Sequence, residues 1–163
     1  MKKLLGVLLV LAALAALGLL PFHGTDAAKL LPVKTVVVTK SGDVYTVDVG
    51  AGVRAVGRSL AEALKRLREE VTGTVFFPTA EQVVVTEPAD DALEAVAEER
   101  AFRPAAGIYR TPETAPDAAA VGEYLSAHPS NVTVLDLRVA LAAGERPEVP
   151  TLLAADGGWR VDE

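Results

Sequence analysis

The stretch "VGRSLAEALKRLREEVTGTVFF", residues 56–77, says most about the architecture of this chain. Ser59 and Glu62 have the S-x-x-E spacing of a capping box, in which both side chains bind free amides at a helix start. Gly73 is placed to end the helix in a left-handed conformation, and residues 74–77 have the composition of a buried strand. We therefore predict a helix that covers a sheet through one apolar stripe: Leu60, Leu64, Leu67 and Val71.

Short β-branched segments precede this helix. Residues 33–39 and 44–50 are separated by residues 40–43, a connection that contains a glycine, and this pattern predicts a hairpin. Residues 53–56 are a candidate third strand. One face of this antiparallel meander is expected to meet water, because residues alternate along the second strand. On the second strand, one face carries Tyr45, Val47 and Val49, and the opposite face carries Val44, Thr46 and Asp48.

Further strands and helices alternate in the rest of the chain. Strands are predicted at residues 82–86, 105–109, 149–154 and 158–161. A helix is predicted after Pro88, where one face carries Ala89, Ala92, Leu93, Val96 and Ala97. A second is predicted at residues 117–127. A third is predicted to begin at a cap formed by Thr133 and Asp136 and to end at Gly144. The fold class is therefore α+β: a single domain with a mixed or antiparallel sheet and about four covering helices, preceded by an N-terminal apolar helix.

The N-terminus has the pattern of a membrane segment. Lys2 and Lys3 precede an uninterrupted apolar run at residues 4–20, and the positive charges favour an inside N-terminus. We expect residues 1–20 to be an anchor or signal segment, 21–32 a linker, and 33–163 an extracytoplasmic domain. The best cleavage pattern, at residues 25–27, is poor, which favours a single-pass anchor in the cell membrane; secretion after signal cleavage is the open alternative.

Charge and composition exclude several partners. Without Lys2 and Lys3 the chain has 14 basic against 22 acidic residues, so the exported part is acidic. Such a surface does not suit nucleic acid, whose phosphates need basic side chains, nor the headgroups of anionic lipids. The chain has no cysteine, which excludes disulfides, thiolate chemistry and an acylated cysteine anchor.

The residue pattern predicts no catalytic, cofactor-binding or metal-binding residue, and no cofactor. Two isolated histidines do not make a zinc site: His23 follows the apolar run, and His128 is placed to stabilise a helix C-terminus. Serine-hydrolase and phosphate-loop motifs are absent from the sequence. The sequon at residues 131–133 overlaps a predicted helix cap, and Trp159 is expected to cover the core. Acidic residues offset the one basic cluster, Lys65, Arg66 and Arg68.

Three segments together resemble the N-terminal domain of the Ger(x)C family, the C-subunits of bacterial spore germinant receptors. They are "LLPVKTVVVTKSGDVYTVDV", "GRSLAEALKRLREE" and "VFFPTAEQVVVTE". The pieces "RPAAGIY", "VTVLDLRVALAAG" and "PEVPTLLAADGGWRV" are similar to the later part of that domain. The resemblance implies a non-catalytic extracytoplasmic domain beside membrane partners in a Gram-positive spore former. Members of that family are longer and carry a lipid-anchor cysteine, which this chain lacks.

Two functional hypotheses arise from these patterns. The first is a non-catalytic, membrane-tethered interaction or scaffold domain, linked by the resemblance to spore germination. It would contact the membrane through residues 4–20 and a membrane-associated protein through its outer domain. The second is a secreted small ligand-binding protein or an enzyme with an unrecognised site, for which the sequence names no ligand. A pocket with convergent polar groups would favour the second hypothesis.

Overall fold

The computed structural model describes residues 30–86, 90–112, 116–155 and 158–162. The predicted anchor or signal segment and most of the predicted linker lie outside these residues, as do His23, Pro88 and Ala89. The chain divides into two compact units, Met1–Leu30 and Leu31–Glu163, and the architecture below is that of the second.

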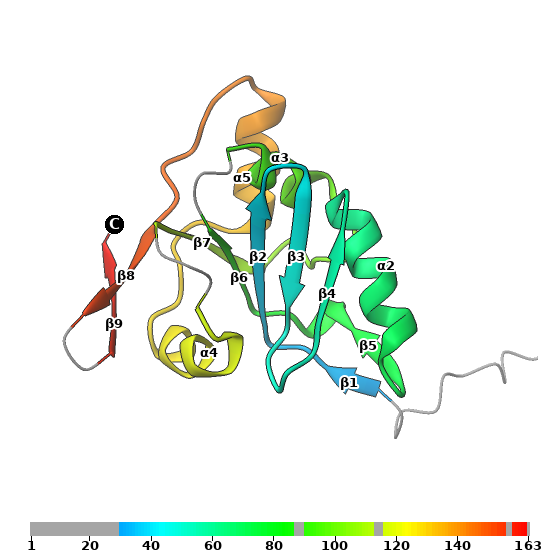
Figure 1. Ribbon diagram of the computed structural model, residues 1–163. Coiled ribbons are helices and arrows are strands. Elements are labelled where there is room, and N and C mark those ends of the chain that lie inside the picture. Colours follow the sequence, from blue (N-terminus) through cyan, green and yellow to red (C-terminus); the bar gives the residue numbers. More distant parts are fainter. Residues whose placement is uncertain (1–29, 87–89, 113–115, 156–157, 163) are drawn as a thin grey trace, which may run out of the picture. The chain divides into compact units, whose positions relative to one another are not determined.

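Seven strands form one mixed β-sheet in the order β4-β3-β2-β6-β7-β8-β9 (Figure 1). Neighbouring strands from β2 to β8 run parallel, whereas the pairs β2–β3, β3–β4 and β8–β9 are antiparallel. The predicted mixed sheet and meander are thus confirmed. The strands are β2 (Thr35–Ser41), β3 (Val44–Asp48), β4 (Arg54–Gly57), β6 (Gln82–Thr86), β7 (Gly107–Thr111), β8 (Thr151–Ala155) and β9 (Gly158–Asp162).

The hairpin between β2 and β3 is tighter than the sequence predicted. Ser41 still pairs with Val44, so the turn consists of Gly42 and Asp43 rather than of residues 40–43. Gly42 has φ +58°, which a glycine adopts without steric cost. The alternation predicted for β3 is confirmed, because Val47 is fully buried while Val44 is 41% exposed.

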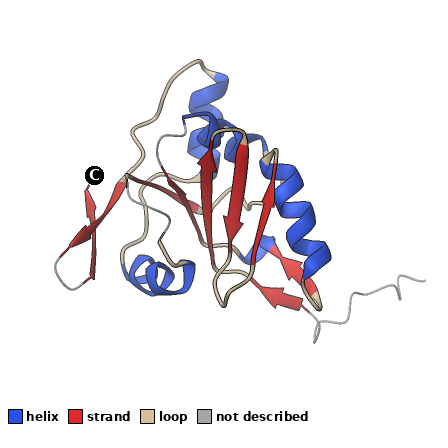
Figure 2. Cartoon of the chain, in the orientation of Figure 1, coloured by secondary structure: helices blue, strands red, loops and turns tan. Residues whose placement is uncertain are grey.

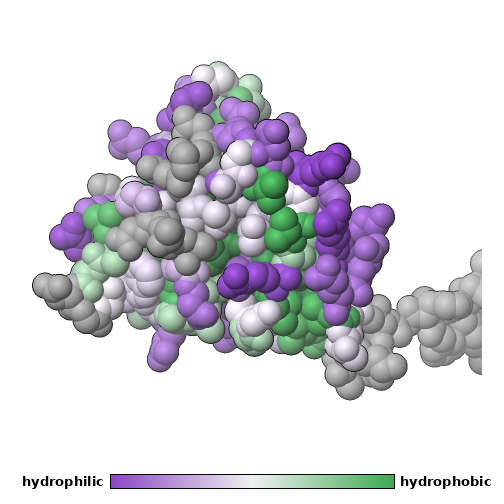
Figure 3. All heavy atoms as spheres, viewed as in Figure 1, coloured by the Kyte–Doolittle hydropathy of each residue, from purple (hydrophilic) through white to green (hydrophobic). Residues whose placement is uncertain are grey.

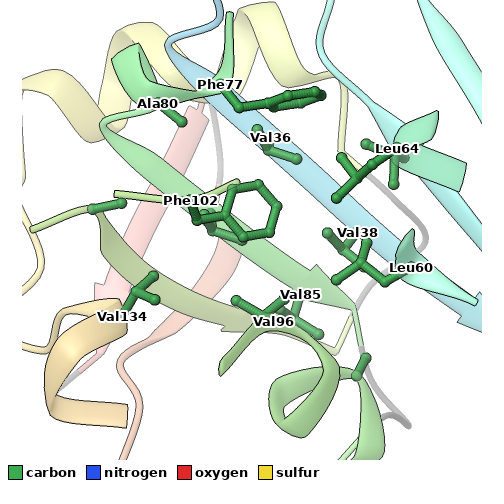
Figure 4. Packing of buried hydrophobic residues seen from close by; sticks show 14 of the residues in the cluster. Val36, Val38, Leu60, Leu64, Phe77, Ala80, Val85, Val96, Phe102 and Val134 are labelled. Atoms are coloured by element: carbon green, nitrogen blue, oxygen red, sulfur yellow. The ribbon is translucent and has the colours of Figure 1, made fainter. Parts of the chain in front are cut away.

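Four helices accompany the sheet in the described residues, and three of them pack on one face. The helices are α2 (Leu60–Glu70), α3 (Asp90–Glu98), α4 (Ala118–Ala127) and α5 (Val134–Ala142). α2, α3 and α5 cover a large apolar cluster to which β2 contributes Val36 and Val38 and β6 contributes Val85. Figure 4 shows these valines with Leu60 and Leu64 of α2, Val96 of α3 and Val134 of α5. This face of the sheet holds most of the core.

Helix α2 begins as predicted but ends differently. The Ser59 side chain accepts a hydrogen bond from the Glu62 amide, and the Glu62 carboxylate accepts one from the Arg58 amide, one residue before the expected partner. The helix ends at Glu70 because Val71 is extended. Gly73 has φ +127°, outside the left-handed helical region, so the prediction that it ends the helix is wrong.

The predicted buried strand at residues 74–77 is wrong in part. β5 (Thr74–Phe76) pairs only with β1 (Leu30–Pro32), in a separate two-stranded sheet. Alternate side chains of β5 therefore face solvent, and Phe76 is 37% exposed while Val75 is buried. Phe77 is buried, but it already belongs to the short 3₁₀ helix η2 (Phe77–Thr79).

The second face of the sheet carries a smaller apolar cluster beneath α4, the helix at lower left in Figure 2. Val37, Val84 and Tyr109 of the three central strands pack there against Val121 and Leu125. The buried residues of this cluster come from α4, β2, β6, β7 and β8. No residue of β3 or β4 belongs to it. This face is therefore only half covered by the described helices.

Candidate functional site

A row of residues crosses the sheet at the amino ends of its central parallel strands. Thr35, Gln82 and Gly107 are the first residues of β2, β6 and β7, and they are neighbours in the strand register. Two residues further along the same strands lie members of the cluster under α4. Because side chains alternate along a strand, the row faces α4.

Thr35 and Gln82 form a buried polar pair in this row. The Thr35 hydroxyl donates to Gln82 Oε1 at 3.0 Å, and each residue is 5% exposed. Gly122 allows α4 to lie close above them, because a Cβ added at Gly122 would be 2.4 Å from Thr35 Oγ1. A small residue in the helix therefore leaves room for two polar side chains in the sheet.

Two hollows open beside this row. The larger, about 480 Å³, lies between α4 and the turn that follows β3, and its lining includes Thr35, Gly50 and Gly122. The smaller, about 210 Å³, lies between the strand ends and the segment after α4, and its lining includes Gln82, Gly107 and Ser130. Ser126 lines both hollows, so they adjoin at the end of α4.

Most polar groups around the smaller hollow already have partners within the protein. The Tyr109 hydroxyl donates to the His128 carbonyl at 2.7 Å, and burial raises the pKa of this phenol. The Ser130 hydroxyl donates to the Ile108 carbonyl and accepts from the Val132 amide, both at 3.0 Å. These residues therefore shape the walls of the hollow and are not free to bind a ligand strongly.

Arg103, which also lines the smaller hollow, differs from these residues. Its Nε is buried and has no hydrogen-bond partner, and none of the described residues forms an ion pair with its guanidinium. A β-turn fixes its backbone, since the Ala106 amide donates to the Arg103 carbonyl at 3.1 Å and Pro104 occupies the second position. The preceding residue, Phe102, is buried against Phe77. Arg103 is thus a positioned cation that forms no ion pair with the described residues, although Glu81 also lines this hollow.

Another arginine outside the sequence-based candidates has a structural role. Arg138 of α5 donates from Nε to the Ala97 carbonyl at 2.7 Å and from Nη2 to the Glu99 carbonyl at 2.8 Å. The Ala97 carbonyl belongs to the last turn of α3, where carbonyls lack partners within the helix, and Glu99 follows the last residue of α3. Arg138 therefore joins the end of α3 to α5.

The residues considered from sequence mostly have structural roles in the described part of the chain. His128 follows α4, where its Nδ1 lies 2.9 Å from the Tyr124 carbonyl and its ring stacks on Tyr124. Thr133 forms the predicted capping box with Asp136. Trp159 is partly buried against the cluster under α4, as expected for a residue that covers the core.

The basic cluster of α2 is not brought together as an anion site. Arg66 pairs with Glu62 at 2.6 Å and Lys65 with Glu69 at 3.8 Å, whereas Arg68 lies over the Phe77 ring at 5.1 Å. Each cation therefore has its own partner on the helix or in the core.

Metal and membrane features can be examined only in the described ranges. Across residues 30–86, 90–112, 116–155 and 158–162, no three His, Asp or Glu side chains converge as a metal site would require. Among the helices within those ranges, none has the length and apolar character needed to cross a bilayer.

Comparison with protein-family models, curated proteins and solved structures gives no match for this chain.

Proposed function

We propose that this chain is a non-catalytic, membrane-tethered extracytoplasmic domain that binds a protein partner beside the membrane. The tether is the apolar run at residues 4–20, with the N-terminus inside. The resemblance to the Ger(x)C N-terminal domain is the sole support for a link to spore germination, and it suggests a membrane-associated protein as the partner.

One observation carries the interaction role: the bare half of the second sheet face. On β3 and β4 this face presents Val44, Thr46 and Val56, and the two valines are 41% and 43% exposed. Figure 3 shows hydrophobic surface over β3 and β4 beside a hydrophilic band. Exposed apolar surface rimmed by polar side chains is typical of protein-binding faces. β4 is also an edge strand, and such an edge can pair with an added strand.

The tether is tested first, by the intact mass and location of the native protein. Full-length chain that stays in the membrane after carbonate washing is the expected result. A shortened chain that begins near Ala28 and is free in the medium would contradict the tether.

The interaction face is tested by photo-cross-linking in the native membrane. A photoreactive residue at position 56 is expected to form an adduct with another protein. A matched probe at Glu69 on α2, whose side chain is 61% exposed on a different surface, is expected to form none. Recovery of monomer alone with both probes, in growing and in sporulating cells, would overturn the proposal.

The alternative is a small ligand-binding protein, and the hollow beside Arg103 favours it. That role requires neither the tether nor a protein partner, so both functions could be tested on the same full-length chain. An enzymatic role receives less support, because the side chains around the hollows include no paired nucleophile and base among the described residues.

A further inference from the structure

The hollow beside Arg103 contains an unusual combination of groups for a protein surface. A half-buried guanidinium forms no ion pair with the described residues, and its buried Nε has no hydrogen-bond partner. Burying an unpaired donor costs free energy, so such groups are uncommon unless something binds them. Arg103 lines the hollow, so a ligand with acceptor atoms bound there would bring a partner to its guanidinium.

A second donor lies in the same hollow. The amide oxygen of Gln82 accepts from Thr35, which leaves the amide nitrogen as the donor of this side chain, in a residue that is 5% exposed. Gln82 and Arg103 both line the hollow. Two residues with donor groups, one charged and one neutral, therefore line one small space.

We propose that this hollow binds a carboxylate group through Arg103 and Gln82. A guanidinium and a carboxylate are both planar, and they form paired hydrogen bonds that a single point charge cannot reproduce. The volume of about 210 Å³ suits a group of a few atoms rather than a large ligand.

The charges around the hollow select a singly charged group. Glu81 lines the same hollow, and the whole chain has a formal net charge of −6. Both features oppose a doubly charged phosphate or sulfate more strongly than a carboxylate. The ligand is therefore expected to carry one negative charge at the Arg103 end.

Such a carboxylate has two sources, a free small acid or the C-terminus of a peptide. The larger hollow adjoins the smaller one at Ser126, so a chain with its carboxylate at Arg103 has room to continue beside α4. The chemistry at Arg103 is the same in both cases. The inference requires neither the tether nor the face over β3 and β4.

The test is an NMR titration of the ¹⁵N-labelled full chain in detergent micelles. The probes are sodium acetate, a tripeptide with a free C-terminus and the same tripeptide with an amidated C-terminus, with sodium chloride and sodium sulfate as matched salts. Acetate or the free tripeptide is expected to shift the Gln82 side-chain amide and the Gly107 amide saturably. Chloride, sulfate and the amidated peptide are expected to leave these signals without a saturable shift.

Variants at Arg103 test separately whether binding depends on the positive charge and on the planar geometry of the guanidinium. Arg103→Gln is expected to weaken binding at least about tenfold, and Arg103→Lys to an intermediate extent, because lysine keeps the charge but not the planar pair of donors. The matched control is Arg66→Gln, which removes an arginine from α2 and should leave binding unchanged. If Arg103→Gln fails to fold, Arg103→Lys still tests the geometry.

The measured affinities distinguish a free small acid from a peptide C-terminus, and some outcomes would overturn the proposal. Equal affinity for acetate and the free tripeptide identifies a small acid, and tenfold or tighter binding of the tripeptide identifies a peptide terminus. The proposal is overturned if neither probe gives a saturable shift, if sulfate competes equally, or if Arg103→Lys binds as tightly as the wild type.

Discussion

The two faces of the central sheet differ in how completely helices cover them. In the described residues the face under α2, α3 and α5 belongs to a buried cluster of 25 residues, whereas the cluster under α4 has 7. Buried apolar area is the main source of stability, so the first face is expected to hold the fold together. The second face has the two hollows beside α4 and the exposed valines of β3 and β4. Its residues can be substituted with a smaller loss of folding stability. On our proposal, the face that contributes less to stability is the one that binds a partner.

The largest expected effect is the loss of a large side chain from the covered face. Leu64 of α2 is fully buried, so Leu64→Ala should lower the free energy of unfolding by about 2–5 kcal/mol, through lost apolar contacts and a cavity. Urea denaturation followed by far-UV circular dichroism measures this change. The matched change on the bare face, Val56→Ala, should cost less than about 0.5 kcal/mol, because Val56 is 43% exposed. Similar losses for both variants would contradict the division between the faces.

Two glycines sharpen the comparison by testing how closely each face holds its helix. A Cβ at Gly57 would lie 2.5 Å from the Ala63 backbone nitrogen in α2, so Gly57→Ala should cost about 3 kcal/mol by forcing the helix away. At Gly122 the obstacle is the Thr35 hydroxyl, a side-chain atom, and alanine also favours the helix by about 1 kcal/mol. Gly122→Ala should therefore cost less than Gly57→Ala in the same denaturation measurement.

The control for both glycine variants is Gly158→Ala in β9, where the added Cβ would meet no heavy atom within 4 Å. This change should be near neutral. If Gly122→Ala proves more harmful than Gly57→Ala, α4 is held more rigidly than its small cluster implies.

Much of the fold could be predicted because its signals are local. The capping box at Thr133 and Asp136, the alternation in β3 and the strand at residues 82–86 each depend on neighbouring residues, and each is confirmed. The isolation of β5 from the main sheet could not be predicted. "TVFF" is apolar enough for a core strand, and only its pairing with β1 separates it from the sheet.

The candidate site was missed because its residues are distant in sequence. One signal was present: "TVVV" at residues 35–38 and "QVVV" at residues 82–85 are similar, and they pair in parallel with Thr35 beside Gln82. That similarity could have placed two polar residues in one row. Nothing local indicates that Arg103 lacks a partner, because this depends on what surrounds its side chain after folding. Unpaired groups are properties of the assembled structure.

A smaller effect is expected from the helix cap on the covered face. Thr133 Oγ1 accepts from the Asp136 amide at 3.2 Å, and Thr133→Ala removes this acceptor. The loss should be about 1 kcal/mol in the free energy of unfolding, as for other cap replacements. Thr133→Ser is the matched control, since it keeps the hydroxyl and should stay near wild type. Equal losses for both would show that the methyl group of Thr133, rather than its cap, matters.

The smallest expected effect is a loss of stability at low pH. It too should act on helices of the covered face, at the starts of α2 and α5. The backbone hydrogen bond from Arg58 to Glu62 keeps the pKa of this carboxyl below its usual 4.5. The hydrogen bonds from the Thr133 side chain and backbone keep the pKa of Asp136 below its usual 3.8. Both carboxylates bind protons less readily in the folded state, so their stabilising contributions are complete above these usual values and are lost as pH falls through the folded pKa values.

Amide hydrogen exchange, corrected for the intrinsic effect of pH, measures the consequence along each helix. Between pH 6 and pH 3, protection at the first turns of α2 and α5 should fall in the wild type. The double variant Glu62→Gln and Asp136→Asn has no charge to lose at these caps, so its protection there should change less over the same range. If the wild type and the double variant lose protection equally, other carboxylates govern the acid response, and the caps do not contribute to the difference between the faces.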